Sequence, residues 1–274
     1  MEVVVSEEFS TVRFEQSDDG VGWLTLTRPE KRNAQSPTMW TELYELGKRL
    51  STDDTLRGLV VRGEGKSFSA GIDLAEGLNG QLVEWAALPP EEVVPAVGTV
   101  PWTFTWIRRL PCVTVAAVQG HAFGAGFQLA LACDLRLFAD NARVGLMENK
   151  FGLLPDMGAT EWLPAIVGEG VARELILLGD VLTAEEAHRI GLANTVVPAA
   201  ELAAATEKLA RRIAALPPLA VAGAKRAVDL AVTATEADSK QAAVDGQVRC
   251  LTSADFQEAR AAFAQGRPAR FTGQ

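Results

Sequence analysis

Residues 120–134 read GHAFGAGFQLALACD, and they follow the apolar run PCVTVAAV at residues 111–118. The apolar run predicts a buried strand, and the stretch after Gly-Ala-Gly predicts a helix. Where a strand turns into a helix through small residues, unpaired backbone N–H groups and the helix dipole point at one spot. The stretch therefore predicts an α/β fold with a place for a negatively charged atom, unless the glycines serve only a tight turn.

A second loop of small residues, FSAGIDL at residues 68–74, follows another apolar strand at residues 56–63. Small residues allow a backbone to approach a ligand closely. If each loop contributes one backbone N–H group to the same oxygen, the two loops form an oxyanion hole, which stabilises a negative oxygen during a reaction. The pair of loops thus points to chemistry at a carbonyl group.

The segments before these loops predict a strand hairpin and a helix. Residues 11–27 alternate between apolar and polar side chains around an Asp-Asp-Gly turn, which is typical of a hairpin. Ser36 and Pro37 are a favourable N-cap and first residue for a helix over about residues 37–50.

The composition of the chain changes near residue 200. Before it, strand and helix signals alternate, and Thr183 and Glu186, for example, form a capping box at the start of a helix. After it, the segments are rich in alanine, follow the period of a helix and lack strand signals. We therefore expect an α/β core with the active site over residues 1–200 and a helical C-terminal region over residues 201–274.

The composition argues against several classes of function. The formal net charge is −9 and the basic residues form no stripe, so we expect no binding to nucleic acid or to an anionic membrane. No apolar run reaches the ~18 residues of a membrane-spanning helix, and the first residues do not resemble a signal peptide. We expect a cytoplasmic protein in which Cys112, Cys133 and Cys250 are reduced thiols. Two histidines are too few for a histidine-rich metal site.

Four segments of the chain match one known family in order and spacing. They are RPEKRNAQS (28–36), FSAGIDL (68–74), GHAFGAGFQLALACD (120–134) and ENKFGLLPDMGAT (148–160). With them, the chain resembles the enoyl-CoA hydratase/isomerase (crotonase) superfamily over about residues 10–265. The resemblance implies a crotonase-type spiral of β-β-α units, whose C-terminal helices support a homotrimer or a dimer of trimers. It also implies an acyl-CoA thioester as substrate, with no metal and no cofactor, since CoA is part of the substrate.

The resemblance implies roles for five residues that bind the thioester. Ile72 and Ala125 would donate the backbone N–H groups of the oxyanion hole. Lys31 and Arg32 would lie where such enzymes meet the CoA phosphates, and Ala70 would lie beside the adenine. The alternative interpretation of Lys31 and Arg32 is that they are ordinary solvated charges.

The family's two catalytic glutamates fall at positions 128 and 148. Hydratases of the family hold the attacking water between them, but this chain has Gln128, and an amide cannot exchange a proton. Glu148 is retained. Leu146, Met147 and Phe151 surround it in the sequence and predict a partly desolvated carboxylate with a raised pKa, which suits a base near neutral pH.

Asp156 lies eight positions after Glu148, where dienoyl-CoA isomerases of the family carry a second acid. The alternative is that Pro-Asp-x-Gly is only a turn. We expect an isomerase that moves a double bond in an enoyl- or dienoyl-CoA, in which Glu148 transfers the proton and the oxyanion hole holds the enolate. The alternatives are an enoyl-CoA hydratase that tolerates Gln128 and, in another class, a weakly catalytic CoA-ester binding protein.

The region over residues 75–110 is less regular and has two interpretations. It contains Trp85, Trp102, Phe104 and Trp106. These aromatic side chains either pack a loop or subunit contact, or form the wall of an apolar acyl pocket.

Overall fold

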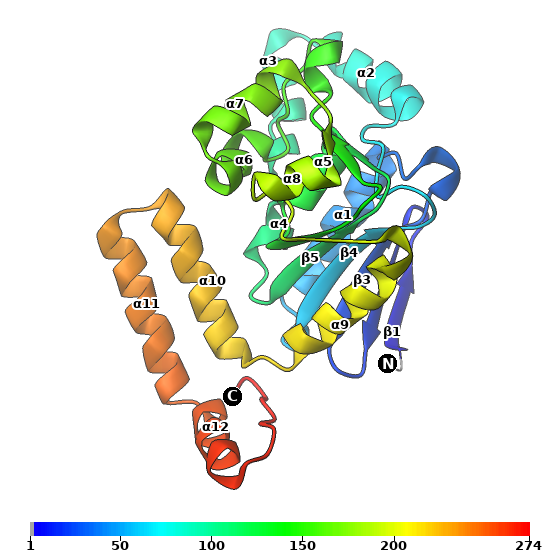
Figure 1. The fold of residues 1–274 in the computed structure, drawn as a ribbon. Coiled ribbons are helices and arrows are strands. Elements are labelled where there is room, and N and C mark those ends of the chain that lie inside the picture. Colours follow the sequence, from blue (N-terminus) through cyan, green and yellow to red (C-terminus); the bar gives the residue numbers. More distant parts are fainter. Residues whose placement is uncertain (1–2) are drawn as a thin grey trace.

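The structure is a computed structural model that describes residues 3–274, and its largest element is a seven-stranded sheet (Figure 1). The strand order is β1-β2-β3-β4-β5-β7-β10. The first three strands pair antiparallel, and each later neighbour pairs in parallel. The strands are β1 (Val3–Glu8), β2 (Val12–Ser17), β3 (Val21–Leu26), β4 (Gly58–Gly63), β5 (Val113–Val118), β7 (Leu135–Ala139) and β10 (Thr195–Val197).

A second sheet contains three short strands, β6 (His121–Phe123), β8 (Arg143–Gly145) and β9 (Leu182–Thr183). β6 comes directly after β5 and β8 directly after β7, so each pair of consecutive strands contributes one strand to each sheet. β6 pairs in parallel with β8, and β8 pairs antiparallel with β9. The α/β class and the spiral of β-β-α units expected from the sequence are confirmed.

Twelve α-helices accompany the sheets over the described residues (Figure 1). They are α1 (Pro37–Leu50), α2 (Leu82–Ala86), α3 (Pro90–Val97), α4 (Thr105–Arg109), α5 (Ala125–Leu131), α6 (Ala159–Val167), α7 (Glu169–Leu178), α8 (Ala184–Arg189), α9 (Leu202–Ala214), α10 (Pro218–Thr233), α11 (Glu236–Leu251) and α12 (Ala254–Gln265). Shorter 3₁₀ turns are η1 (Pro29–Lys31), η3 (Val100–Trp102), η4 (Glu148–Phe151) and η5 (Ala199–Glu201), and η2 (Leu74–Gln81) is a π-helix.

Both faces of the large sheet are buried along β3, β4, β5 and β7, as is usual for parallel strands, whereas the edge strand β1 is exposed. Neighbouring residues of β3 show this, because Trp23 and Leu24 belong to different core clusters. Leu24 packs in the cluster that includes the apolar side of α1, and Trp23 packs in the cluster that includes Ile213 of α9. The helix α9 lies along the sheet in Figure 1.

Two helix starts follow the capping signals in the sequence. Ser36 Oγ accepts a hydrogen bond from Met39 N at 3.3 Å, and Pro37 is the first residue of α1. Thr183 Oγ1 accepts from Glu186 N at 3.2 Å, while Thr183 N donates to Glu186 Oε2 at 2.8 Å. The capping box before α8 is therefore confirmed.

The helices α10 and α11 form an antiparallel pair that extends away from the sheets (Figure 1). They approach closely at Gly223 and Gly246, where a Cβ on either glycine would lie 3.3 Å from the other's Cα. Lys225 of α10 pairs with Asp134 at 2.7 Å and so connects the helix pair to the core. The part of the C-terminal region that leaves the core thus begins at α10, since α9 still packs on the sheet.

The helix α11 lies within the region expected to be helical, but the pattern of its own residues indicates a helix only weakly. Of its sixteen residues, only Ala242 is buried. Its larger apolar residues, Val244, Val248 and Leu251, all lie in the second half, so the first half lacks the apolar positions that predict a helix. Its contact with α10 includes the close approach of Gly223 and Gly246, and glycine carries little helix signal in a sequence.

Candidate active site

A cavity of about 760 Å³ lies between the two glycine-containing loops, the segment around η4, and the helices η2 to α3. Its lining is mainly apolar, and aliphatic and aromatic side chains of α2, α3 and η3 form one wall. Its acidic lining residues, among those described, are Asp73, Glu148 and Asp156, and its one basic lining residue is Lys31. The cavity therefore combines an apolar pocket with a small group of ionisable side chains, which is typical of a ligand site.

Ser69 joins the two loops of small residues. Ser69 N donates to His121 O at 2.9 Å, and Phe123 N donates to Ser69 O at 3.1 Å, so the first loop extends the small sheet. Gly126 faces this contact, and a Cβ there would lie 2.7 Å from Ser69 Oγ. Position 126 therefore requires glycine, because the loop of residues 68–74 approaches it too closely for any side chain.

Ile72 and Ala125 come to the same edge of the cavity. Gly71 has φ +93°, and a Cβ on it would lie 2.6 Å from Phe123 O and 3.7 Å from Ala125 N, which shows how closely the loops approach. Over residues 3–274, neither Ile72 N nor Ala125 N donates a hydrogen bond to another group of the chain. Two free N–H groups beside an apolar cavity are what an oxyanion hole requires, and their role as donors stays a prediction.

Glu148 lies at the first residue of η4, beside the oxyanion-hole loop. Its Oε1 accepts a hydrogen bond from Gln128 Nε2 at 2.7 Å, while its Oε2 is buried without a partner among the described atoms. Burial raises the pKa of Glu148, the charge of Asp156 raises that pKa further, and the hydrogen bond from Gln128 lowers it. Gly124 packs under the carboxylate, since a Cβ there would lie 3.3 Å from Oε1.

Gln128 is almost completely buried, with 1% of its surface exposed. Its Oε1 accepts hydrogen bonds from Met157 N at 2.8 Å and from Ala159 N at 3.2 Å. The same side chain thus contacts Glu148 on one side and the start of α6 on the other.

Asp156 lines the cavity from the loop between η4 and α6. Burial raises the pKa of this carboxyl, and over the described residues its side chain forms no ion pair. A carboxyl that only caps a turn bonds to nearby backbone N–H groups and is usually solvated. The structure brings Asp156 to the same cavity as Glu148 and leaves its catalytic role a prediction.

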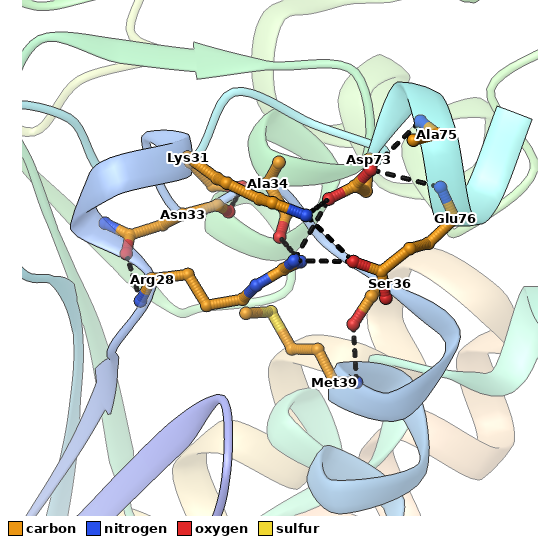
Figure 2. Close-up of polar contacts among 10 residues, drawn as sticks. Arg28, Lys31, Asn33, Ala34, Ser36, Met39, Asp73, Ala75 and Glu76 are labelled. Carbon is orange, nitrogen blue, oxygen red and sulfur yellow. Dashed lines mark hydrogen bonds and ion pairs between the residues drawn. The ribbon is translucent and has the colours of Figure 1, made fainter.

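Four side chains form a cluster that we call the ion-pair clasp: Arg28, Lys31, Asp73 and Glu76 (Figure 2). Lys31 and Asp73 also line the cavity. Lys31 Nζ lies 2.9 Å from Glu76 Oε1 and 3.2 Å from Asp73 Oδ2, and Arg28 contacts the same two carboxylates. Asp73 Oδ1 also accepts from Ala75 N at 3.0 Å and from Glu76 N, and so caps η2. The clasp therefore fixes the start of η2 directly after Ile72.

The three residues expected at the CoA end of the site lie in different surroundings. Lys31 and Ala70 line the cavity, but Lys31 is paired within the clasp. Arg32 is exposed and is not part of the lining, although Arg32 O accepts a hydrogen bond from Ala70 N at 2.9 Å. Contact between these residues and CoA stays a prediction.

The sequence did not indicate Glu76 or Trp40 as site residues. Trp40 lines the cavity, and its Nε1 donates to Gln35 Oε1 at 2.9 Å, so its carbon surface is available to a ligand. An amphipathic-helix pattern places Trp40 on α1, but nothing in that pattern distinguishes a cavity residue from a core residue. Of the aromatic residues over 75–110, Trp85 lines the cavity, whereas Phe104 is in the core and Trp102 is exposed.

None of the three cysteines lines the cavity. Burial raises the pKa of the Cys112 and Cys133 thiols to about 12, so both stay protonated near neutral pH. Over residues 3–274, no three His, Cys, Asp or Glu side chains gather closely enough to hold a metal ion. None of the described helices is both long and apolar enough to cross a membrane.

A spiral of β-β-α units, with two free N–H groups beside a half-buried glutamate, defines the crotonase class of proteins. The family model described as Enoyl-CoA hydratase/isomerase matches residues 16–274, and the chain belongs to this family, which acts on acyl-CoA thioesters. The resemblance noted in the sequence is thereby confirmed.

The chain is similar to relatives named as isomerases and to relatives named as hydratases. The 1,2-epoxyphenylacetyl-CoA isomerase of Escherichia coli is 35% identical and the match covers 94% of this chain and 97% of that protein. The crotonyl-CoA hydratase of Syntrophomonas wolfei is 32% identical, with 93% and 96% covered. The crystal structure of an enoyl-CoA hydratase from Bacillus anthracis matches with a TM-score of 0.84 at 29% identity and covers 100% of both chains.

Proposed function

We propose that this enzyme is an isomerase that moves a double bond in an unsaturated acyl-CoA. The observation that supports the proposal is the pairing of one carboxylate, Glu148, with an amide, Gln128, where family hydratases have two glutamates. Hydration by a glutamate pair needs both side chains to handle the water and its protons. Gln128 cannot exchange a proton, and its carbonyl oxygen is already occupied by two backbone N–H groups.

In the proposed reaction, the thioester oxygen accepts hydrogen bonds from Ile72 N and Ala125 N. Glu148 removes a proton from C2, and the electron pair of the broken C–H bond delocalises into the carbonyl to give an enolate. The C3–C4 double bond shifts to C2–C3 as a proton returns to C4 from the same carboxyl group. The proton count is conserved, because Glu148 is again ionised at the end.

Asp156 extends the proposal to dienoyl-CoA substrates. Moving a proton from C2 to C6 of a conjugated diene spans a longer distance than one side chain covers easily, so a second acid at the far end is useful. Asp156→Asn keeps the side-chain size and removes the charge. We expect it to greatly reduce conversion of 3,5-dienoyl-CoA to 2,4-dienoyl-CoA and to affect a 3-enoyl-CoA much less. If neither reaction changes, Asp156 is only a turn residue.

Product analysis tests the isomerase proposal directly. A panel of enoyl- and dienoyl-CoA esters is incubated with the enzyme, and the products are identified by mass and NMR. Double-bond migration supports the proposal, whereas water addition to crotonyl-CoA at the rate of a dedicated hydratase would establish the alternative. Gln128→Glu is then expected to add hydratase activity. Turnover of any ester excludes a protein that only binds CoA esters.

The cavity also supports a proposal on the acyl group, which we infer to be apolar and uncharged. Trp40, Trp85, Val93 and Val97 contribute to its wall, and no basic side chain other than the clasped Lys31 lines it among the described residues. A carboxylate on the acyl group would find no partner there.

The exposed face of the C-terminal helices supports self-association into the expected trimer or dimer of trimers. Val228 and Val232 of α10 and Val244 and Val248 of α11 are exposed, and Phe263 of α12 is 91% exposed. Apolar side chains on helices that leave the core are typical of a subunit contact. Sedimentation velocity tests this proposal, and a monomer at micromolar concentration would contradict it. A cytoplasmic location stays a prediction.

A further inference from the structure

We propose that Gln128 is a positioning residue that holds Glu148 with Oε2 as its only proton-carrying oxygen and ties it to the loop of Asp156. The inference rests on the proposed function only for the proton that Glu148 moves. Its geometric part concerns a hydrogen-bond network that exists without substrate.

The network fixes which end of the Gln128 amide faces Glu148. Met157 N and Ala159 N are donors, so the group that faces them at 2.8 and 3.2 Å must be the carbonyl oxygen. The Nε2 group therefore points the other way, toward Glu148 Oε1 at 2.7 Å. Reversing the amide would place N–H groups against N–H groups at a buried position, which is strongly unfavourable.

This arrangement makes the two oxygens of Glu148 unequal. Oε1 is occupied by a donor that cannot accept a proton in return, and Oε2 is the oxygen without a partner among the described atoms. Gly124 leaves room for the carboxylate beside the turn that carries Ala125 N. Oε2 is thus the oxygen free to take a proton from a carbon next to the bound carbonyl.

The same amide connects the two acids. Met157 follows Asp156 directly, and Ala159 is the first residue of α6. The loop that places Asp156 is therefore held by the Gln128 oxygen, while Glu148 is held by the Gln128 nitrogen. On η4 itself the other ionisable side chain is Lys150, whose Nζ points to Met147 Sδ at 3.8 Å. From the other elements, the ionisable side chains that line the cavity over the described residues are Asp156, Asp73 and Lys31.

A glutamate at position 128 changes the network in a defined way. One of its oxygens can keep both backbone N–H groups, but the other would face Glu148 Oε1 at the distance that Gln128 Nε2 now occupies. Two carboxylates this close share a proton, and the pair then loses its protons in two separate steps. In the natural chain the residue at position 128 adds no titrating group to this pair, because an amide does not exchange a proton.

The experiment compares Gln128→Glu and Gln128→Met with the unmodified enzyme. The first readout is exchange of the C2 protons of a saturated ester, butyryl-CoA, with D₂O, followed by NMR over a range of pH. The second is kcat and KM for a 3-enoyl-CoA. Gln119→Met is the matched control, because the Gln119 amide also ties two backbone groups, Gly63 O and Gly65 O, but lies outside the cavity.

We expect Gln128→Glu to convert a single carboxyl step in the pH profile of exchange into two steps. We expect Gln128→Met to lower kcat by about 10²-fold, the cost of misplacing a reacting group by ~1 Å, with KM changed less than about threefold. Gln119→Met should leave both readouts unchanged. Asp156 is present in every variant. A change in the number of titration steps in the pH profile of exchange therefore comes from the substitution at position 128.

The positioning role is wrong if Gln128→Glu keeps one step at the original pH, or if Gln128→Met keeps its kcat. If Gln128→Met does not fold, Gln128→Glu still decides, because it retains the acceptor for Met157 N and Ala159 N. The isomerase proposal fails separately. An enzyme that exchanges C2 protons with the expected pH profiles but never moves a double bond refutes the proposed reaction and supports the positioning role.

Discussion

Glu148→Gln should remove nearly all activity and stabilise the fold. The substitution keeps the size of the side chain and the acceptor for Gln128 Nε2 but removes the group that carries the proton. Loss of a positioned general base typically lowers the rate by 10²–10⁴-fold, so we expect kcat to fall by about that factor. Binding of a CoA ester should stay within a few-fold, because the oxyanion N–H groups and the apolar wall are unchanged.

The effect on stability follows from the raised pKa of Glu148, which burial causes. A carboxyl whose pKa is higher in the folded state favours folding when it is protonated and opposes folding when it is ionised. The free-energy cost of burying the ionised carboxylate is absent at low pH. It appears as the pH rises through the pKa that Glu148 has in the unfolded chain, and it is complete above the pKa that Glu148 has in the folded chain. The variant removes the charge but keeps one unpartnered polar atom at this position, so we expect a gain of about 1 kcal/mol, the free energy of one pKa unit. About 1 kcal/mol raises Tm by ~2–4 °C in a domain somewhat smaller than this chain.

Thermal unfolding at pH 8 and pH 4 measures this effect. The variant should be more stable than the natural chain at pH 8, and the difference should shrink at pH 4. Glu185→Gln, an exposed position on α8, is the control and should change neither Tm nor kcat. Unchanged kcat in Glu148→Gln would show that another group is the base, and a lower Tm at pH 8 would contradict the burial argument.

Three further changes test other parts of the site. Gly71→Ala places a Cβ 2.6 Å from Phe123 O at φ +93°, and should lower kcat by about 10²–10³-fold, the cost of one oxyanion donor; normal kcat would remove this loop from the hole. Glu76→Gln weakens the pairing of Lys31 and should lower KM for a CoA ester by roughly threefold, within the energy of an exposed ion pair, whereas unchanged KM would mean that Lys31 does not meet CoA. Val97→Trp should raise KM for long acyl chains and spare crotonyl-CoA, and equal effects on both would place the acyl group elsewhere.

The sequence predicted those parts of the fold that local chemistry determines. The hairpin of β2 and β3, the start of α1 at Ser36 and the capping box at Thr183 depend on residues within a few positions of one another. The two loops of small residues were also predictable, because close backbone approach restricts residue type. In α11, by contrast, the larger apolar residues are confined to the second half, and its pairing with α10 depends on a partner in another helix.

The candidate site was predictable as a set of positions but not as a network. Glu148 and Asp156 could be placed together by the family's motif order, yet the orientation of the Gln128 amide depends on Met157 N and Ala159 N, which no sequence pattern reports. The ion-pair clasp could not be predicted from the sequence for a similar reason. The contact of Lys31 with Glu76 spans 45 positions, and either residue alone is an ordinary surface charge.

The π-helix η2 has a consequence for how the substrate range of this enzyme can evolve. A π-helix holds more residues per turn than an α-helix, so a chain that lost one residue between 74 and 81 could relax to an ordinary helical turn and remain continuous. Its start would stay in place, because Asp73 caps it, and the displaced part would be α2 with Trp85. Deletions and insertions in this one segment can therefore reshape the acyl pocket across generations while Ile72 keeps its position.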